Sequence, residues 1–306
     1  MDFEQITFFD LTMPTIAIDK PIRLIELFAG VGSTAQALRD LGANYEHWRV
    51  CEIDKYAISS YNSIFGTDFE VTDIKDLKGN DLEIVDTEDY CYILTYSFPC
   101  QDLSICGRQA GMKKGSGTRS GLLWEVERLL LETEHLPQIL IMENVPTVHS
   151  QENLPDFKKW IDFLESKGYS NYWQDLNSRD YGIPQNRERC FMVSILGKYN
   201  YKFPKRIALE QIMRDYLEET VDDKYYITTE KAKTLVESLI HEGKILNESQ
   251  GGVETVDLSF SHAATIDVAN AICRRYDAGI VLHKYEHPGV CQWEKLSKGR
   301  ENGTHG

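Results

Sequence analysis

The chain has 306 residues, of which 42% are hydrophobic and 26% are charged, and its formal net charge is −15 at pH 7. This is the balance of a globular protein, and the acidic charge argues against a general nucleic-acid-coating protein, because such proteins are usually basic. A nucleic-acid enzyme with a local basic cleft stays open. No stretch reaches the roughly 18 apolar residues that a membrane span needs, and residues 1–5 lack the pattern of a secretion signal. The seven scattered cysteines include no Cys-x-x-Cys pair, which predicts a reduced, intracellular protein without a structural zinc site.

Short apolar runs alternate with helical patterns through the first two thirds of the chain. Strands are expected at residues 22–28, 47–52, 89–97, 137–142 and 189–196, and helices at 34–41, 55–65, 122–134 and 153–167. This alternation predicts an α/β fold in which a mostly parallel sheet carries helices on both faces. Ligands bind at the carboxyl ends of the strands in such sheets, so motifs that follow different strands are expected to meet in one cleft.

The character of the sequence changes after about residue 204. A helix is expected near residues 230–240, but residues 247–261 are rich in glycine, serine and asparagine, and no strand–helix alternation resumes. We therefore expect a catalytic domain at residues 21–204 and a smaller region at residues 205–306.

A glycine turn follows the first expected strand. Residues 28–32 read Phe-Ala-Gly-Val-Gly, which lets the backbone pass close to a ligand at the N-terminus of the next helix. Glu52 ends the next strand about twenty residues later, where a carboxylate can bind both hydroxyls of a ribose. This spacing favours a cofactor that contains adenosine. It does not choose between a nicotinamide dinucleotide and S-adenosylmethionine.

Three later segments carry reactive groups. They read Ser-Phe-Pro-Cys-Gln at residues 97–101, Glu-Asn-Val at 143–145 and Gln-Asn-Arg-Glu-Arg at 185–189. Pro99 fixes the backbone before Cys100, and a strand-end loop would expose the sulfur. Taken alone, a free cysteine is more often buried filler, a strand-end acid a cap, and a basic strand edge a solvated surface. Together, a thiol, a carboxylate and two arginines are the groups that an attack on a pyrimidine ring needs.

In this order the motifs resemble those of the cytosine-C5 DNA methyltransferases, which move a methyl group from S-adenosylmethionine to carbon 5 of cytosine. The resemblance covers residues 21–196 well. It implies a Rossmann-like methyltransferase fold, S-adenosylmethionine as cofactor, double-stranded DNA as partner and a target base flipped out of the duplex. It also implies a cytoplasmic, nucleoid-associated enzyme of a bacterial or phage modification system, with neither a membrane nor a metal as partner.

The resemblance assigns catalytic roles to four residues. Cys100 would add to carbon 6 of the cytosine, and Glu143 would hold ring N3. Arg189 would reach the cytosine O2, and Arg187 the phosphate or the catalytic loop. On a strand the two arginines would share a face, because they alternate.

Further residues are assigned to the cofactor and to DNA. The resemblance places at the cofactor Phe28, Ala29, Gly30, Gly32, Glu52, Asp73, Ile74, Pro99 and Leu122. It places on the DNA side Gln101, Ser104 and Asn144, of which Asn144 would also brace the nucleophile loop. The glycine-rich stretch 107–117 is expected to close over the flipped base.

The C-terminal region follows the family pattern less closely. Residues 224–227 resemble the start of its target-recognition region, but the closing Gly-Asn-x-Val motif does not occur. A truncated product, a split enzyme completed by a second subunit and a degenerate copy are all open. The functional alternatives are the same chemistry on transfer RNA and a non-catalytic DNA-binding subunit. Intact catalytic positions count against the latter. A nicotinamide oxidoreductase would explain only the glycine turn and Glu52.

Overall fold

The computed structural model describes residues 13–100, 103, 111–216, 222, 226–227, 230, 234, 237–238, 241–242, 253–257, 264–265, 269–270, 280–284 and 291–293. Among these residues no helix is long and apolar enough to cross a membrane. The helix expected near residues 230–240 falls mostly outside them, and its described members Glu230, Thr234, Glu237 and Ser238 are helical.

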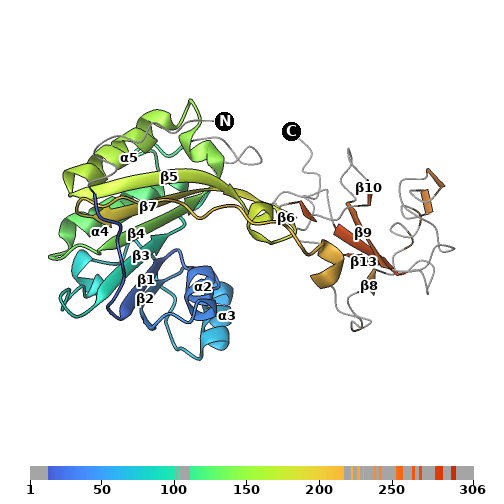
Figure 1. Cartoon of the computed structure of the whole chain (residues 1–306), viewed down its shortest axis with the longest axis horizontal. Helices are drawn as coiled ribbons and strands as arrows, with labels where there is room; N and C mark the ends of the chain where they lie inside the picture. Colours follow the sequence, from blue (N-terminus) through green and yellow to red (C-terminus); the bar gives the residue numbers. More distant parts are fainter. Residues whose placement is uncertain are drawn as a thin grey trace, which may run out of the picture. The chain divides into compact units, whose positions relative to one another are not determined.

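The chain divides into two compact units (Figure 1). The first comprises Met1–Leu176 and Arg189–Pro204, and the second comprises Asn177–Glu188 and Lys205–Gly306. The sequence analysis assigned all of residues 21–204 to one domain. In the structure, the short segment before Arg189 clusters instead with the second unit, so the chain leaves the first unit and returns to it.

The first unit is built on a six-stranded sheet in the order β2-β1-β3-β4-β7-β5. Its strands are β1 (Ile22–Leu27), β2 (Tyr45–Cys51), β3 (Cys91–Tyr96), β4 (Ile139–Asn144), β5 (Tyr169–Asn177) and β7 (Glu188–Leu196). Strands β1 to β4 run parallel, and β7 is antiparallel to β4. The predicted α/β class with a mostly parallel sheet is confirmed. Strand β5 was not predicted, because it lies at the sheet edge, mostly half-buried or exposed, and carries no apolar run.

Helices cover both faces of this sheet (Figure 1). They are α2 (Ser33–Asp40), α3 (Lys55–Phe65), α4 (Leu123–Glu132) and α5 (Leu154–Ser166). Helix α3 begins after Asp54, whose carboxylate accepts hydrogen bonds from two backbone N–H groups of the first turn, and ends at Gly66 with φ 69°. Helices α4 and α5 belong to one apolar core, and α2 and α3 to the other. Short 3-10 turns of the first unit are η1 (Gly79–Leu82), η2 (Ser120–Leu122) and η3 (Pro146–His149), and η4 (Ser178–Tyr181) and η5 (Met213–Tyr216) belong to the second unit.

The second unit contains a five-stranded sheet in the order β10-β9-β12-β13-β8. Its strands are β8 (Tyr226–Ile227), β9 (Val253–Asp257), β10 (Ala264–Thr265), β12 (Ile280–Lys284) and β13 (Cys291–Trp293). All of its strand pairs are antiparallel. In a separate pair, β6 (Gln185–Asn186) runs parallel to β11 (Ala269–Asn270). These short strands were not predicted from the sequence.

Strand β1 buries two charged side chains among apolar neighbours. The Arg23 guanidinium lies 3.7 Å from the ring centroid of Trp48 and 3.6 Å from that of Tyr90. Glu26 is 2% exposed and accepts a 2.6 Å hydrogen bond from the Tyr61 hydroxyl of α3. Burial raises the pKa of Glu26 to about 7, although the hydrogen bond from Tyr61 acts in the opposite direction. Helix α3 is thereby fastened to β1 just before the glycine turn.

The raised pKa of Glu26 makes stability depend on pH. The folded state holds this proton more tightly than the unfolded chain, whose carboxyl has the ordinary pKa of 4.5. The resulting stabilisation is fully present below pH 4.5 and is lost as the pH rises through 7. The free energy of unfolding should fall by roughly 3 kcal/mol across this window.

Glu26→Gln should flatten this pH dependence, because the amide does not titrate. Urea unfolding of the parent and the variant at several pH values between about 4 and about 8 measures the difference. Glu70→Gln, at an exposed position, is the control and should follow the parent. Equal pH slopes for the parent and Glu26→Gln would contradict the assignment.

Candidate active site

Strands β1 to β4 end at the same level. The register places Leu27 beside Tyr96, and Tyr96 beside Met142. The glycine turn after β1, Glu52 after β2, the nucleophile loop after β3 and the Glu-Asn-Val segment at the end of β4 therefore share the carboxyl edge of the sheet. This edge is the candidate active site.

The two glycines of the turn serve different purposes. Gly30 and Gly32 both have positive φ, 57° and 86°. A Cβ atom on Gly32 would lie 2.5 Å from the Phe65 ring and 2.7 Å from the Tyr61 ring, so the packing of α3 leaves no room for a side chain. Around a Cβ on Gly30 the described structure has no atom within 4 Å. The turn is therefore open at Gly30. At position 32, the packing of the Phe65 and Tyr61 rings is by itself enough to require glycine.

Glu52 is fixed beside this turn by backbone donors. The N–H of Gly30 donates to Oε2 and the N–H of Asp54 donates to Oε1, both at 2.8 Å. The N–H of Thr72 donates to the Glu52 carbonyl at 2.9 Å, which joins the segment before Asp73 to the end of β2. This hydrogen bond therefore joins Glu52 to the residue that directly precedes Asp73, and these are the two acids expected at the cofactor.

Other residues expected at the cofactor lie around the same edge. Phe28 is partly buried and has φ 59°. The Asp73 carboxylate accepts a hydrogen bond from the N–H of Lys75, whereas the side chain of Ile74 is buried in the core. Leu122, at the end of η2, packs partly buried against the α4–α5 core.

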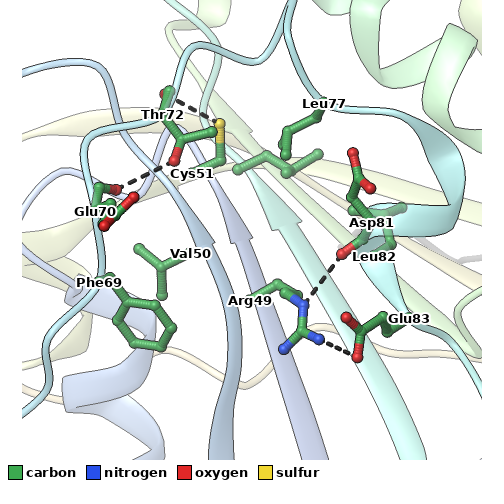
Figure 2. A pocket seen from close by; sticks show the side chains of 11 residues that line it. Arg49, Val50, Cys51, Phe69, Glu70, Thr72, Leu77, Asp81, Leu82 and Glu83 are labelled. Atoms are coloured by element: carbon green, nitrogen blue, oxygen red, sulfur yellow. Dashed lines mark hydrogen bonds and ion pairs between the residues drawn. The ribbon is translucent and has the colours of Figure 1, made fainter.

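A cavity of about 330 Å³ opens next to these segments (Figure 2). Its walls include the ends of β1 and β2, residues 69, 70 and 72, and part of η1. Across the cavity, the Cys51 thiol donates to the Thr72 carbonyl, and Arg49 donates to the Asp81 carbonyl and pairs with Glu83 (Figure 2). Neither Cys100 nor Glu143 belongs to its lining. None of the residues predicted at the cofactor lines it either, but three of its lining residues, Leu27, Cys51 and Thr72, directly precede Phe28, Glu52 and Asp73 in the chain.

Two buried side chains hold the loop that carries Cys100. The Asn144 amide donates to the Phe98 carbonyl at 2.9 Å, and its oxygen accepts from the N–H of Val145 at 2.9 Å. The Ser120 hydroxyl donates to the Pro99 carbonyl at 2.6 Å. The backbone immediately before the half-buried Cys100 is therefore fixed at two consecutive residues.

Ser120 was not singled out from the sequence. A small hydroxyl residue before a long helix carries no distinctive signal, and only the fold brings it against Pro99. The amide of Asn144 is engaged inside the protein, so a contact between Asn144 and DNA stays a prediction.

Glu143 and Arg189 form an ion pair across β4 and β7. Nε of Arg189 lies 3.0 Å from Oε1 of Glu143, and their side chains are 18% and 26% exposed. The antiparallel pairing of β4 with β7 brings them together. Arg187 lies before the start of β7 and within the second unit. Because only Arg189 belongs to β7, the two arginines do not alternate along one strand. Its N–H donates to the Gln185 carbonyl, and its carbonyl accepts from the N–H of Ser178.

Several predicted positions fall outside the described residues. These are Gln101, Ser104 and residues 107–110 of the stretch expected to close over a base. The described end of that stretch is anchored, because the buried Met112 accepts a 2.7 Å hydrogen bond at its carbonyl from the Trp124 indole.

The sheet order and the site at its strand ends define an α/β protein with the methyltransferase fold. The methyltransferase EhMeth of Entamoeba histolytica has this fold, with a TM-score of 0.58, 21% identity and coverage of 72% of this chain and 66% of that chain. The Dnmt2 methyltransferase of S. pombe has a TM-score of 0.54, 22% identity and coverage of 73% and 65%.

Residues 22–288 match the family model of the C-5 cytosine-specific DNA methylases, and the chain belongs to this family. It is 43% identical over 176 residues to the type II methyltransferase M2.ScrFI of Lactococcus lactis subsp. cremoris, covering 57% of this chain and 45% of the relative. It is 42% identical over 182 residues to the orphan methyltransferase M.SssI of Spiroplasma monobiae, covering 58% and 45%. The matched part thus spans about half the length of these relatives. The family resemblance drawn from the motifs is confirmed.

Asn144→Ala should destabilise the protein and loosen the nucleophile loop. The buried Phe98 carbonyl and the Val145 N–H would lose their partner, at a cost of about 1–3 kcal/mol in the free energy of unfolding. Urea unfolding measures this loss, and mapped alkylation of Cys100 should become faster. Asn80→Ala, at an exposed position of η1, is the matched control. Unchanged stability and an unchanged alkylation rate would rule out the brace.

Proposed function

We propose that this chain transfers a methyl group from S-adenosylmethionine to carbon 5 of cytosine in double-stranded DNA, as an intracellular modification enzyme of bacterial or phage type. One observation carries the proposal: Cys100 sits on a braced loop at the sheet edge that also presents the Glu143–Arg189 ion pair. The family match supports the reaction, and the relatives named above are type II and orphan methyltransferases.

The residues of the first unit divide the chemistry between them. The Cys100 thiolate adds to carbon 6 of the cytosine, and the displaced electron pair makes carbon 5 nucleophilic. Glu143 takes up a proton and donates it to ring N3, and Arg189 donates to O2 as negative charge develops there. When bound, S-adenosylmethionine supplies the electrophilic methyl group that carbon 5 attacks. Loss of the carbon 5 proton and expulsion of the Cys100 thiolate then restore the ring.

The cofactor side of the edge suits an adenosine. The open face at Gly30 leaves room for a ligand against the backbone of the turn. Each Glu52 oxygen accepts one backbone hydrogen bond and keeps lone-pair capacity for a ribose hydroxyl. We assign Phe28 to stack on the adenine and Asp73 to bind its amine. The remaining predicted contacts, Ala29, Gly32, Ile74, Pro99 and Leu122, complete the cofactor side in this proposal.

The DNA side of the proposal rests on the family match rather than on described contacts. We assign the DNA backbone to Gln101 and Ser104, and the phosphate or the catalytic loop to Arg187. The target cytosine must leave the duplex to reach Cys100, because the stacked base is inaccessible to the thiol.

Cys100→Ser should abolish methyl transfer, with a rate loss of more than about 1000-fold, because the covalent nucleophile is lost. The measurement is transfer of radiolabel from S-adenosylmethionine to mixed-sequence duplex DNA and, in parallel, to transfer RNA. Cys91→Ser removes a buried thiol of β3 and is the matched control, which should keep activity.

Duplex DNA with 5-fluorocytosine adds a direct test of the covalent step. Fluorine cannot leave carbon 5 as a proton does, so an adduct should persist on the peptide that contains Cys100. Label in transfer RNA alone would favour that substrate. An active Cys100→Ser variant would refute the mechanism, and no label on either substrate would favour a split enzyme that needs a second chain.

A further inference from the structure

A second cluster of reactive side chains lies in the first unit, apart from the groups assigned above. His149 ends η3, Asp175 lies on β5 and Cys190 lies on β7. Their nitrogen, oxygen and sulfur atoms all lie within 4.8 Å of one another. Within the described parts of the chain, this is the only group of three such side chains with ligand-like spacing.

The Asp175 carboxylate is the centre of the cluster. Nε2 of His149 lies 3.0 Å from each of its two oxygens. The buried Cys190 thiol lies within 4.8 Å of this carboxylate, and burial together with the carboxylate charge raises the pKa of the thiol. The imidazole and the thiol therefore converge on one acid from two different elements.

Aromatic rings pack beside His149, and part of the cluster is exposed to solvent. The Trp173 ring lies 4.7 Å from the His149 ring, centroid to centroid, and the buried Phe157 ring lies 6.1 Å away. These aromatic walls limit the rotation of the imidazole. The His149 and Asp175 side chains remain 22% and 30% exposed, so a small ion can reach the cluster from solvent.

The donor set selects a class of ion. Imidazole nitrogen, carboxylate oxygen and thiolate sulfur are the ligands of Zn²⁺, and sites with three protein ligands keep a fourth position for water or another ligand. Calcium and magnesium prefer sites made of oxygen alone, and sulfur disfavours them. We propose that His149, Asp175 and Cys190 form a binding site for a divalent cation of the zinc class.

The site lies directly beside the proposed catalytic groups. Cys190 stands opposite Asn144 in the pairing of β4 with β7, and it follows Arg189 in the chain. Cys190 is thus the strand partner of the residue that braces the nucleophile loop and the chain neighbour of the arginine that pairs with Glu143. Binding of the metal does not itself depend on the proposed methyl transfer.

Co²⁺ is the probe, because its bond to a thiolate gives a charge-transfer absorption band. Titration of the reduced, full-length chain should give this band with one ion per chain, and added Zn²⁺ should remove it. Cys190→Ser should abolish the band. His149→Gln and Asp175→Asn should each weaken binding by at least about 100-fold, because each removes a direct ligand and even the loss of a group that only orients a ligand costs about 10–100-fold. Cys100→Ser and Cys91→Ser, which remove a half-buried and a buried thiol, should both keep the band.

The outcomes separate a metal site from an ordinary ion pair with a neighbouring thiol. No band in the parent chain at a tenfold excess of Co²⁺ would overturn the proposal, as would a band that survives Cys190→Ser or disappears with Cys100→Ser. Circular dichroism shows whether each variant is folded. If Cys190→Ser does not fold, Asp175→Asn, which keeps the side-chain size, decides the question through its affinity for Co²⁺.

Discussion

Two buried donors beneath the nucleophile loop are the contacts on which the arrangement of the candidate active site depends. A loop after a strand has no partner in the sheet, so its path must be set by other hydrogen bonds. Here Asn144 and Ser120 bind the two carbonyls that precede Cys100. Asn144 follows Glu143 in β4, so one strand end positions the proposed acid and also holds the loop of the nucleophile. A change in this strand end would displace both groups together.

The charged groups of the first unit are stabilised in pairs. Glu143 and Arg189 are each largely shielded from water, and removal of either would break this ion pair. Arg23 is held between two aromatic rings and bound to Glu46 and Tyr92. These charged side chains of the sheet are therefore stabilised because each has a partner built into the fold.

Tyr61 links the core to the cofactor side of the site. Its hydroxyl binds the buried Glu26 of β1, and its ring fills the space that a side chain at position 32 would need. The glycine turn therefore packs against α3 at Gly32, while the turn stays open at Gly30. Gly32 serves the packing against α3, and Gly30 is left for the proposed contact with the ligand.

The sequence by itself determined the order of the motifs, the α/β class and the mostly parallel sheet, because apolar periodicity and glycine turns are local signals. The family could also be recognised from Pro99–Cys100, Glu143 and the arginine segment. Only the tertiary structure decided the edge strand β5, the separation of Arg187 from Arg189, the Ser120 brace and the cluster around Asp175. Those features arise where strands far apart in the chain pair in a particular register, and no local pattern of residues specifies which side chains that register brings together.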